Sequence, residues 1–209
     1  MRGLAVVHLI CSESLILPFS LWEGRSDHVC GGNVGGSCTL SNVLAVRSIE
    51  NFGFTPSELR TLRALKTPVG VQKFLDDLPY NLSYTARSPK KVIDDRIASC
   101  LEGGIFAAAA LRVLGFPALI FDLEAEQDTE HVAAIFTVRG HWCPVSKSNF
   151  TGCRYREPYY RTPREPAMSS FTISCNLRYA TTIRRYTRHM NLPLFERIHW
   201  MTTEEPHGC

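Results

Sequence analysis

Apolar residues recur at helical spacing through the part of the chain that begins near residue 55. Three leucines between residues 59 and 65 are separated by intervals of three. They follow a Thr-Pro-Ser-Glu start in which Thr55 and Glu58 have the spacing of a capping box. Thr-Pro at 67–68 and Ser-Pro at 88–89 repeat this start signal. The pattern therefore predicts three short helices before residue 100.

The stretch SCLEGGIFAAAALRVLG at 99–115 is small and apolar on almost every side. Its four consecutive alanines have high helix propensity, and Gly115 is a typical helix end. We expect a helix that begins at Cys100 and lies at the centre of the domain, because alanine lets neighbouring elements approach closely.

Apolar runs after this helix have the length of strands. They cover residues 117–123, 131–138 and 141–147, and Arg139-Gly140 is the short turn expected between the second run and the third. A central helix followed by these strands predicts an α+β fold, with helices packed on a small antiparallel sheet and the candidate nucleophile at a helix N-terminus.

The two ends of the chain have weaker patterns. Residues 171–179 are compatible with a strand, and residues 192–201 with a short helix or a strand. The first fifty residues include CGGNVGGSC, whose four glycines favour flexibility. We therefore expect a loosely ordered N-terminal extension over residues 1–50 and a single domain over residues 51–209.

Composition narrows the class of protein. The chain has 209 residues, 44% of them hydrophobic, which is sufficient for one domain with a substantial core. Its formal net charge of +3 gives no argument for nucleic acid. Nine arginines and no lysine follow residue 150, so this segment is either a solvated basic face or a surface that meets anions.

Cysteine spacing and the N-terminus bear on the compartment. The eight cysteines include no C-x-x-C pair, which argues against a zinc ribbon or a thioredoxin-type site. The apolar stretch at the N-terminus is interrupted by Ser-Glu-Ser at residues 12–14, which spoils both a signal-peptide core and a membrane span. We expect a reduced, cytoplasmic protein with no membrane contact, and a cleaved leader is the alternative.

Cys100 is the candidate nucleophile. At the first position of a helix, the unpaired backbone amides and the helix dipole favour a thiolate. The same amides can receive the oxyanion of a tetrahedral intermediate, so one position supplies two functions. The structural alternative is a buried, inert cysteine, which is a common environment for this residue type.

His131, at the start of the second predicted strand, is the candidate base. A histidine at the mouth of a strand can reach the beginning of a helix packed across the sheet. Lone histidines near strands are more often structural, and this is the alternative. A cysteine at a helix start followed by a histidine at a strand start is the combination that favours chemistry.

A cysteine–histidine pair also needs a group that orients the imidazole. With a two-residue turn in the hairpin, Ser148 lies opposite His131, and Ser146 and Asn149 lie close by. Asn149 is chemically adequate for this role. Asp122, at the end of the preceding strand, is a second candidate.

The motifs around these residues resemble those of the transglutaminase-like superfamily. The motifs are C-x-E-G at 100–103, G-x-P at 115–117, H-V-x-A at 131–134 and G-x-W at 140–142. The resemblance implies a papain-like fold with a Cys–His–Asp triad, carried over here to Cys100 and His131. It extends over about residues 55–205, where the chain looks like a group of uncharacterised bacterial transglutaminase-like proteins.

One position departs from the resemblance. The place usually held by the triad aspartate is occupied by Ser146. Serine orients an imidazole more weakly than a carboxylate does, so the third member of the triad is left open between Ser146 and Asn149.

Several functions follow from these candidates. The favoured one is a cysteine-dependent hydrolase of a peptide or other amide, in which Cys100 forms a thioester and His131 is base and acid. An amine acceptor in place of water would make it an acyltransferase, and arginines in the C-terminal segment make carboxylate-bearing substrates a mild expectation.

A catalytically silent binding module is the second hypothesis. The third is a metal site at His141 and Cys143, with His131 and Cys153 nearby, although the spacing fits no familiar zinc pattern. No cofactor is implied.

Three further residues have structural interpretations. Glu102 is expected to complement the helix dipole, although it could line the site. Tyr80 could approach the nucleophile, but packing is the more common role of an aromatic residue. Trp142 is expected to pack between the strands and the helix that begins at Cys100.

Overall fold

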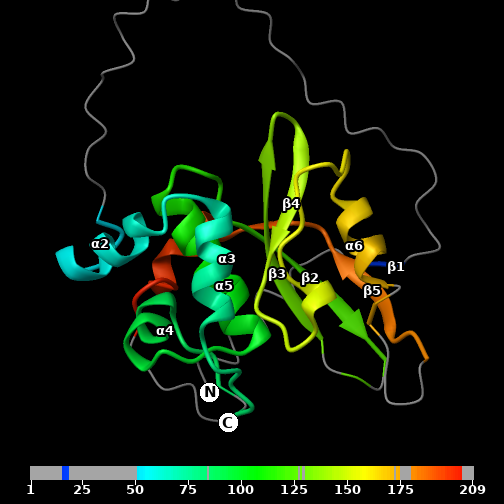
Figure 1. Ribbon diagram of the computed structural model, residues 1–209, viewed down its shortest axis with the longest axis horizontal. Coiled ribbons are helices and arrows are strands. Elements are labelled where there is room, and N and C mark those ends of the chain that lie inside the picture. The colour runs from blue at the N-terminus through cyan, green and yellow to red at the C-terminus, as the bar shows by residue number, and fades with distance from the viewer. Residues whose placement is uncertain are drawn as a thin grey trace, which may run out of the picture.

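The computed structural model describes residues 16–18, 51–83, 85–126, 128, 130–171, 173–174 and 180–203. Its helices are α2 (Pro56–Ala64), α3 (Pro68–Asp76), α4 (Pro89–Asp95), α5 (Cys100–Val113) and α6 (Arg164–Phe171), with 3₁₀ turns at Thr151–Cys153 and Leu192–Ile198. Its strands are β1 (Ile16–Pro18), β2 (Leu119–Ala125), β3 (His131–Val138), β4 (His141–Val145), β5 (Ile183–Thr187) and β6 (Met190–Asn191). Helices on a small antiparallel sheet make the fold α+β, as predicted (Figure 1).

Each of the first three helices begins at the residue pair that predicts it. Thr55 caps α2 through a full capping box, in which its hydroxyl accepts from the amide of Glu58 and the Glu58 carboxylate accepts from the amide of Thr55. The hydroxyls of Thr67 and Ser88 cap α3 and α4. Proline follows each cap, at a position where its missing amide is not needed. Local chemistry therefore fixes these three helix starts.

The strands of the sheet pair antiparallel in the order β1-β5-β2-β3-β4, and β6 pairs with β2. The β3–β4 hairpin has the predicted register, with Val138 opposite His141. The turn residues Arg139 and Gly140 have φ angles of 52° and 79°, and two positive φ angles are typical of a tight type I′ turn. The hairpin therefore returns the chain after β4 to the beginning of β3.

Helix α5 lies in the core, where it packs against β3 and against α2, α3 and α4. Figure 1 shows these helices on one side of the sheet and α6 on the other. Ala107–Ala110 are fully buried, and Phe106 stacks on Phe74 with ring centroids 4.8 Å apart. The alanine-rich helix is therefore the centre of the main apolar core, as predicted.

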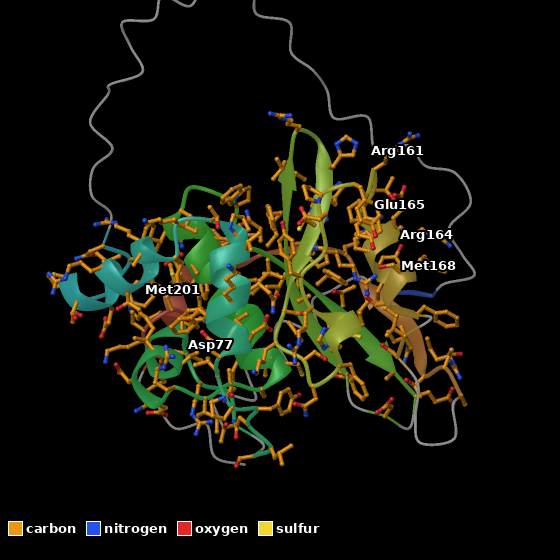
Figure 2. All side chains as sticks on the ribbon, in the orientation of Figure 1. Asp77, Arg161, Arg164, Glu165, Met168 and Met201 are labelled. Atoms are coloured by element: carbon orange, nitrogen blue, oxygen red, sulfur yellow. The ribbon has the colours of Figure 1, made fainter. Side chains whose placement is uncertain are left out.

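A second, smaller apolar cluster lies on the face of the sheet covered by α6. Trp142 packs against this cluster, and its ring centroid is 5.4 Å from that of His189. The expectation that Trp142 packs between the strands and α5 is therefore wrong. Alternate residues of a strand face opposite sides, and it is the next residue, Cys143, that enters the main core. Figure 2 shows Met168 on the α6 side of the sheet and Met201 within the helical layer.

Two glycines let the beginning of α5 approach the sheet closely. A β-carbon added to Gly103 would lie 2.3 Å from Cβ of Lys147, and one added to Gly104 would lie 2.9 Å from Cγ1 of Val132. Neither position has room for a side chain. The glycines after Cys100 therefore set the short distance between the start of α5 and the β3–β4 hairpin.

The chain beyond residue 160 differs from its predicted pattern. Phe171 ends helix α6, so the strand predicted for residues 171–179 is wrong at its first residue, and residues 172 and 175–179 lie outside the described residues. Helix α6 and strand β5 have no counterpart in the prediction. The segment Leu192–Ile198 is helical, which is one of the two predicted alternatives.

Within the first fifty residues, the described part is β1. It pairs with β5, with Ile16 opposite Thr187. The glycine-rich run and the rest of the expected extension lie outside the described residues, so the division near residue 50 stays a prediction. In the described part of the chain, no helix is both long enough and apolar enough to cross a membrane.

Candidate active site

The candidate nucleophile occupies the first position of α5. Ser99 caps the helix: its hydroxyl accepts from the amide of Glu102 at 3.3 Å, and the Glu102 carboxylate accepts from the amide of Ser99 at 2.8 Å. This second capping box fixes the direction in which the helix starts. Cys100 is a free, half-buried thiol at the positive end of the helix dipole.

Cys100 lines a pocket of about 180 Å³. The same pocket is lined by His131 and Asn149, so the structure brings three of the four predicted site residues together. The fourth, Ser146, is 1% exposed and contacts the His131 ring. Their catalytic roles stay predictions.

The helix start and the strand start meet at this pocket. The Sγ atom of Cys100 lies 3.5 Å from the carbonyl oxygen of Glu130, which is the residue directly before His131. The sequence predicts that the start of α5 and the start of β3 lie close together, and the two glycines of α5 explain how they approach.

The His131 ring is held through one nitrogen. Its Nε2 atom lies 3.1 Å from the carbonyl oxygen of Cys153 and 3.2 Å from the hydroxyl oxygen of Ser146. A carbonyl can only accept a hydrogen bond, so Nε2 carries the proton in the neutral ring. Among the described residues, none hydrogen-bonds to Nδ1, which leaves that nitrogen as the basic atom.

Ser146 is itself fixed from α3. The side-chain amide of Gln72 accepts from the backbone N–H of Ser146 at 3.2 Å and donates to its carbonyl at 2.9 Å. The Ser146 hydroxyl donates to the Cys153 carbonyl, so serine and carbonyl form one unit beside the imidazole. Ser146 therefore contacts His131 from the position where the resemblance expects aspartate. The acceptor for the His131 N–H is the Cys153 backbone carbonyl, and Ser146 supports that carbonyl with its own hydrogen bond.

Burial lowers the pKa of His131 to about 4, and the hydrogen bond with the Cys153 carbonyl offsets only part of this effect. The positive charge of Arg156 lowers the pKa further. The imidazole is therefore neutral at pH 7. A carboxylate in the position of Ser146 would have favoured the imidazolium, and its absence is one reason that the ring rests uncharged.

The other candidate orienting residues are placed differently. Asn149 lines the pocket, but within the described residues it makes no hydrogen bond to His131. The hydroxyl of Ser148 accepts from the amide of Phe150 at 3.0 Å. Asp122 is opposite Val132 in the β2–β3 ladder, and its backbone amide donates to the hydroxyl of Thr187. Of the four candidates, Ser146 is the one with a side-chain atom within hydrogen-bond distance of the His131 ring.

Glu102 is fully buried and does not line the pocket. Its carboxylate accepts from the side chains of Asn81 at 3.0 Å and Thr85 at 2.7 Å, and it forms an ion pair with Arg87 at 3.1 Å. Although burial opposes ionisation, these hydrogen bonds hold the pKa of Glu102 below its usual value. The carboxylate thus fastens the loop over residues 81–87 to the start of α5.

Tyr80 also lines the pocket beside Cys100. Burial and the neighbouring Cys100 thiol raise the pKa of Tyr80 above its usual value, and a hydrogen bond with the Cys100 backbone offsets part of the rise. Of the two sequence interpretations for this residue, approach to the nucleophile is the one that fits the structure. The adjacent pair Pro79-Tyr80, just before a polar loop, is too weak a sequence signal to have selected it.

The pocket wall carries negative rather than positive side chains. Asp128 and Glu130 line it, and no lysine or arginine of the described residues does. Two arginines of β5 are paired elsewhere, Arg184 with Glu126 and Arg185 with Glu124. Arg164 begins α6, and Arg161 lies just before it, on the side of the sheet away from α5 (Figure 2). These four arginines therefore give no support to carboxylate-bearing substrates, which stay an untested expectation.

The metal hypothesis finds no cluster to support it. Across the described residues, no group of three or more histidine, cysteine, aspartate or glutamate side chains is placed to hold a metal ion. His141 is exposed and its Nδ1 lies 3.2 Å from the carbonyl of Arg139, whereas Cys143 is buried. Burial raises the pKa of the Cys143 thiol to about 12.

Comparison with known proteins gives weak likenesses. Sixteen solved chains match, among them a protein from Cytophaga hutchinsonii provisionally assigned as a cysteine protease, with a TM-score of 0.34 and 15% identity over 42% of this chain. Another, described as a TGase, has a TM-score of 0.38 and 16% identity over 60% of this chain. The alignments cover only 30% and 39% of those two proteins. No protein family and no curated protein matches the chain. At these TM-scores the likenesses carry no argument, and the α+β fold class rests on the chain's own helices and sheet.

Proposed function

We propose that this protein is a cysteine-dependent enzyme that hydrolyses a peptide or another amide through a thioester. One observation carries the proposal. The Cys100 thiol and a His131 ring whose Nε2–H tautomer is fixed line the same pocket. A nucleophile, a base and a group that orients the base are the elements that this chemistry requires.

The first half-reaction forms the thioester. His131 Nδ1 takes the thiol proton as Sγ of Cys100 attacks the carbonyl carbon of the amide. The tetrahedral intermediate collapses when the imidazolium returns this proton to the leaving amine, and the C–N bond breaks. The acyl group is then held on Cys100.

The second half-reaction releases the acyl group. Nδ1 of His131 removes a proton from water as the water oxygen attacks the thioester carbonyl. The carbon–sulfur bond breaks and the proton passes to Sγ, which restores the free thiol. An amine in place of water gives transamidation. Water is the default acceptor, so hydrolysis ranks first. Asp128 and Glu130 in the pocket wall are the groups that would suit a protonated amine acceptor.

A binding module without catalytic activity is the second candidate function, and the environment of His131 is the observation that favours it. The imidazolium formed in each half-reaction faces a carbonyl and a hydroxyl instead of a carboxylate, and its pKa of about 4 makes it costly to form. In a domain that has lost catalysis, the same residues would serve only to hold the hairpin.

The proposal is tested with p-nitrophenyl acetate, whose activated carbonyl needs no specific substrate pocket. We expect the wild-type protein to release p-nitrophenolate and to carry a hydroxylamine-sensitive acetyl group on the peptide that contains Cys100. Cys100→Ala should abolish both. His131→Ala should lower turnover by about 10²–10⁴-fold, the usual contribution of a general base. Acetylation that Cys100→Ala leaves unchanged would exclude this mechanism, and no acetylation in any variant would favour the binding module.

A further inference from the structure

The loop before the nucleophile's helix holds Tyr80 beside that helix through its backbone. Tyr80 and Ala98 form an isolated parallel β-bridge. The amide of Asn81 donates to the carbonyl of Ala98 at 3.0 Å, and the amide of Ala98 donates to the carbonyl of Pro79 at 3.3 Å. Tyr80 is thus tied to a residue that lies two positions before Cys100.

The buried carboxylate of Glu102 holds the other end of the same loop. It accepts from the Asn81 side chain, the backbone amide of Arg87 and the helix-capping residue Ser99. The backbone around Tyr80 is therefore fixed on both sides relative to the first turn of α5. A side chain on such a segment has the fixed position that a preorganised hydrogen-bond donor requires.

The helix start has few amides left for an oxyanion. The amide of Glu102 donates to the Ser99 hydroxyl, and the amide of Gly103 donates to the Ser99 carbonyl at 2.9 Å. In this first turn, the amides of Cys100 and Leu101 are the ones that remain for an oxyanion. That free helix amides receive the oxyanion stays a prediction, limited to these two amides, and a side-chain donor beside them would add to their effect.

The Tyr80 side chain has a suitable place and protonation state. It is half-buried and lines the same pocket as Cys100. An oxyanion on an acyl group bound to Sγ is only two covalent bonds from that sulfur, so it forms in the pocket that Tyr80 lines. Burial and the thiol raise the pKa of Tyr80, so the phenol keeps its proton at neutral pH.

We propose that Tyr80 is a catalytic residue whose hydroxyl donates a hydrogen bond to the oxyanion formed when Cys100 attacks an acyl carbonyl. This inference rests on the proposed thioester mechanism. With p-nitrophenyl acetate, the carbon–sulfur bond forms as the carbonyl electrons move to oxygen, and the thiol proton passes to His131. Tyr80 stabilises that oxygen until the carbonyl re-forms and p-nitrophenolate leaves.

Two reagents separate this role from a structural one. Attack on p-nitrophenyl acetate passes through an oxyanion, whereas displacement of iodide from iodoacetamide does not. We expect Tyr80→Phe to slow acetylation of Cys100 by about 10²-fold, as loss of one oxyanion donor does, and to change its alkylation by less than about threefold. Tyr80→His, which restores an N–H donor, should recover part of the acetylation rate.

The matched control is Tyr159→Phe, because Tyr159 is 59% exposed and does not line the pocket. It should leave both rates unchanged. An equal loss of acetylation and alkylation in Tyr80→Phe would overturn the proposal, since Tyr80 would then act on the thiol alone. Unchanged acetylation would overturn it as well. Failure of the thioester mechanism itself is recognised separately, because Cys100→Ala would then leave p-nitrophenolate release intact.

Discussion

The Nε2 atom of His131 lies 3.1 Å from the backbone carbonyl oxygen of Cys153. This contact fixes the ring tautomer without a carboxylate, and the nearby Ser146 hydroxyl supports it by donating to the same carbonyl. The group that holds the ring of the candidate base is therefore a main-chain carbonyl in the turn at Thr151–Cys153.

Replacing Ser146 by alanine is expected to have a small effect on catalysis. The Cys153 carbonyl still accepts from Nε2, so Nδ1 remains the basic nitrogen of His131. Turnover of p-nitrophenyl acetate should fall by less than about fivefold, because the neutral hydrogen bond that is lost contributes about 1 kcal/mol. Nitrogen-15 NMR of the imidazole should show the Nε2–H tautomer in both proteins. A mixture of tautomers in Ser146→Ala would show that the hydroxyl, not the carbonyl, orients the ring.

The free energy of unfolding should decrease as the pH is lowered through a range set by the pKa of His131. Its pKa is lowered from 6.5 to about 4 in the folded protein, so between these values the unfolded chain binds the proton more readily. The contribution is complete above pH 6.5 and is lost as the pH falls toward 4. Because the ring is half-buried, we expect a loss of about 1–3 kcal/mol in the free energy of unfolding, measured by urea titration at pH 7 and pH 4.

The control for this pH effect is a pair of histidine variants. His131→Ala should reduce the difference in stability between pH 7 and pH 4, since it removes the group responsible. His141→Ala, at an exposed site in the hairpin, should keep the wild-type difference. Equal pH dependence in His131→Ala and the wild type would rule out a buried neutral imidazole.

Removing the Glu102 carboxylate should destabilise the protein strongly. Glu102→Ala leaves Arg87, Asn81 and Thr85 without their shared acceptor, and we expect a loss of about 3–5 kcal/mol in the free energy of unfolding. Glu102→Gln keeps the shape but not the charge, so it should cost less. Glu126→Gln, which breaks the exposed ion pair with Arg184, should change stability by less than about 1 kcal/mol. A cost for Glu102→Ala no larger than that of Glu126→Gln would contradict the anchoring role.

A methyl group at Gly103 should separate the helix from the hairpin. Its β-carbon would lie 2.3 Å from Cβ of Lys147, the residue after Ser146, so α5 or the chain just after β4 must move. We expect Gly103→Ala to cost about 1–3 kcal/mol, as overpacking does, and to slow ester turnover because the two halves of the site separate. Urea titration and the p-nitrophenyl acetate assay measure the two effects. Gly140→Asn is the control, since that turn has open space and asparagine tolerates positive φ.

Local signals account for the parts of the fold that the sequence predicts. Helix starts at Thr55, Thr67 and Ser88 depend on residues three positions apart, and the β3–β4 register depends on a two-residue turn. The strand β5 and helix α6 depend on partners far along the chain. β5 pairs with β2 and β1, and α6 needs the second apolar cluster to cover. Their own residues carry too little apolar periodicity to reveal them.

The candidate site likewise has residues that the sequence predicts and residues that it does not. Cys100 and His131 are predictable because each stands at the start of an element with a clear pattern. The Cys153 carbonyl has no side-chain signature, and Gln72 is recognisable only as a polar residue on the apolar face of α3 once its partner Ser146 is known. Tyr80 is brought to the nucleophile by a backbone bridge to Ala98, which no local spacing encodes.

A main-chain acceptor has an evolutionary consequence. Every residue type supplies the same carbonyl, so substitution at position 153 does not remove this acceptor. On this geometry, a chain with another residue at position 146 would still present Nδ1 of the histidine as a base. A signature that demands an acidic third residue would discard such proteins as inactive, whereas one built on the helix-start cysteine, the glycine after it and the strand-start histidine would retain them.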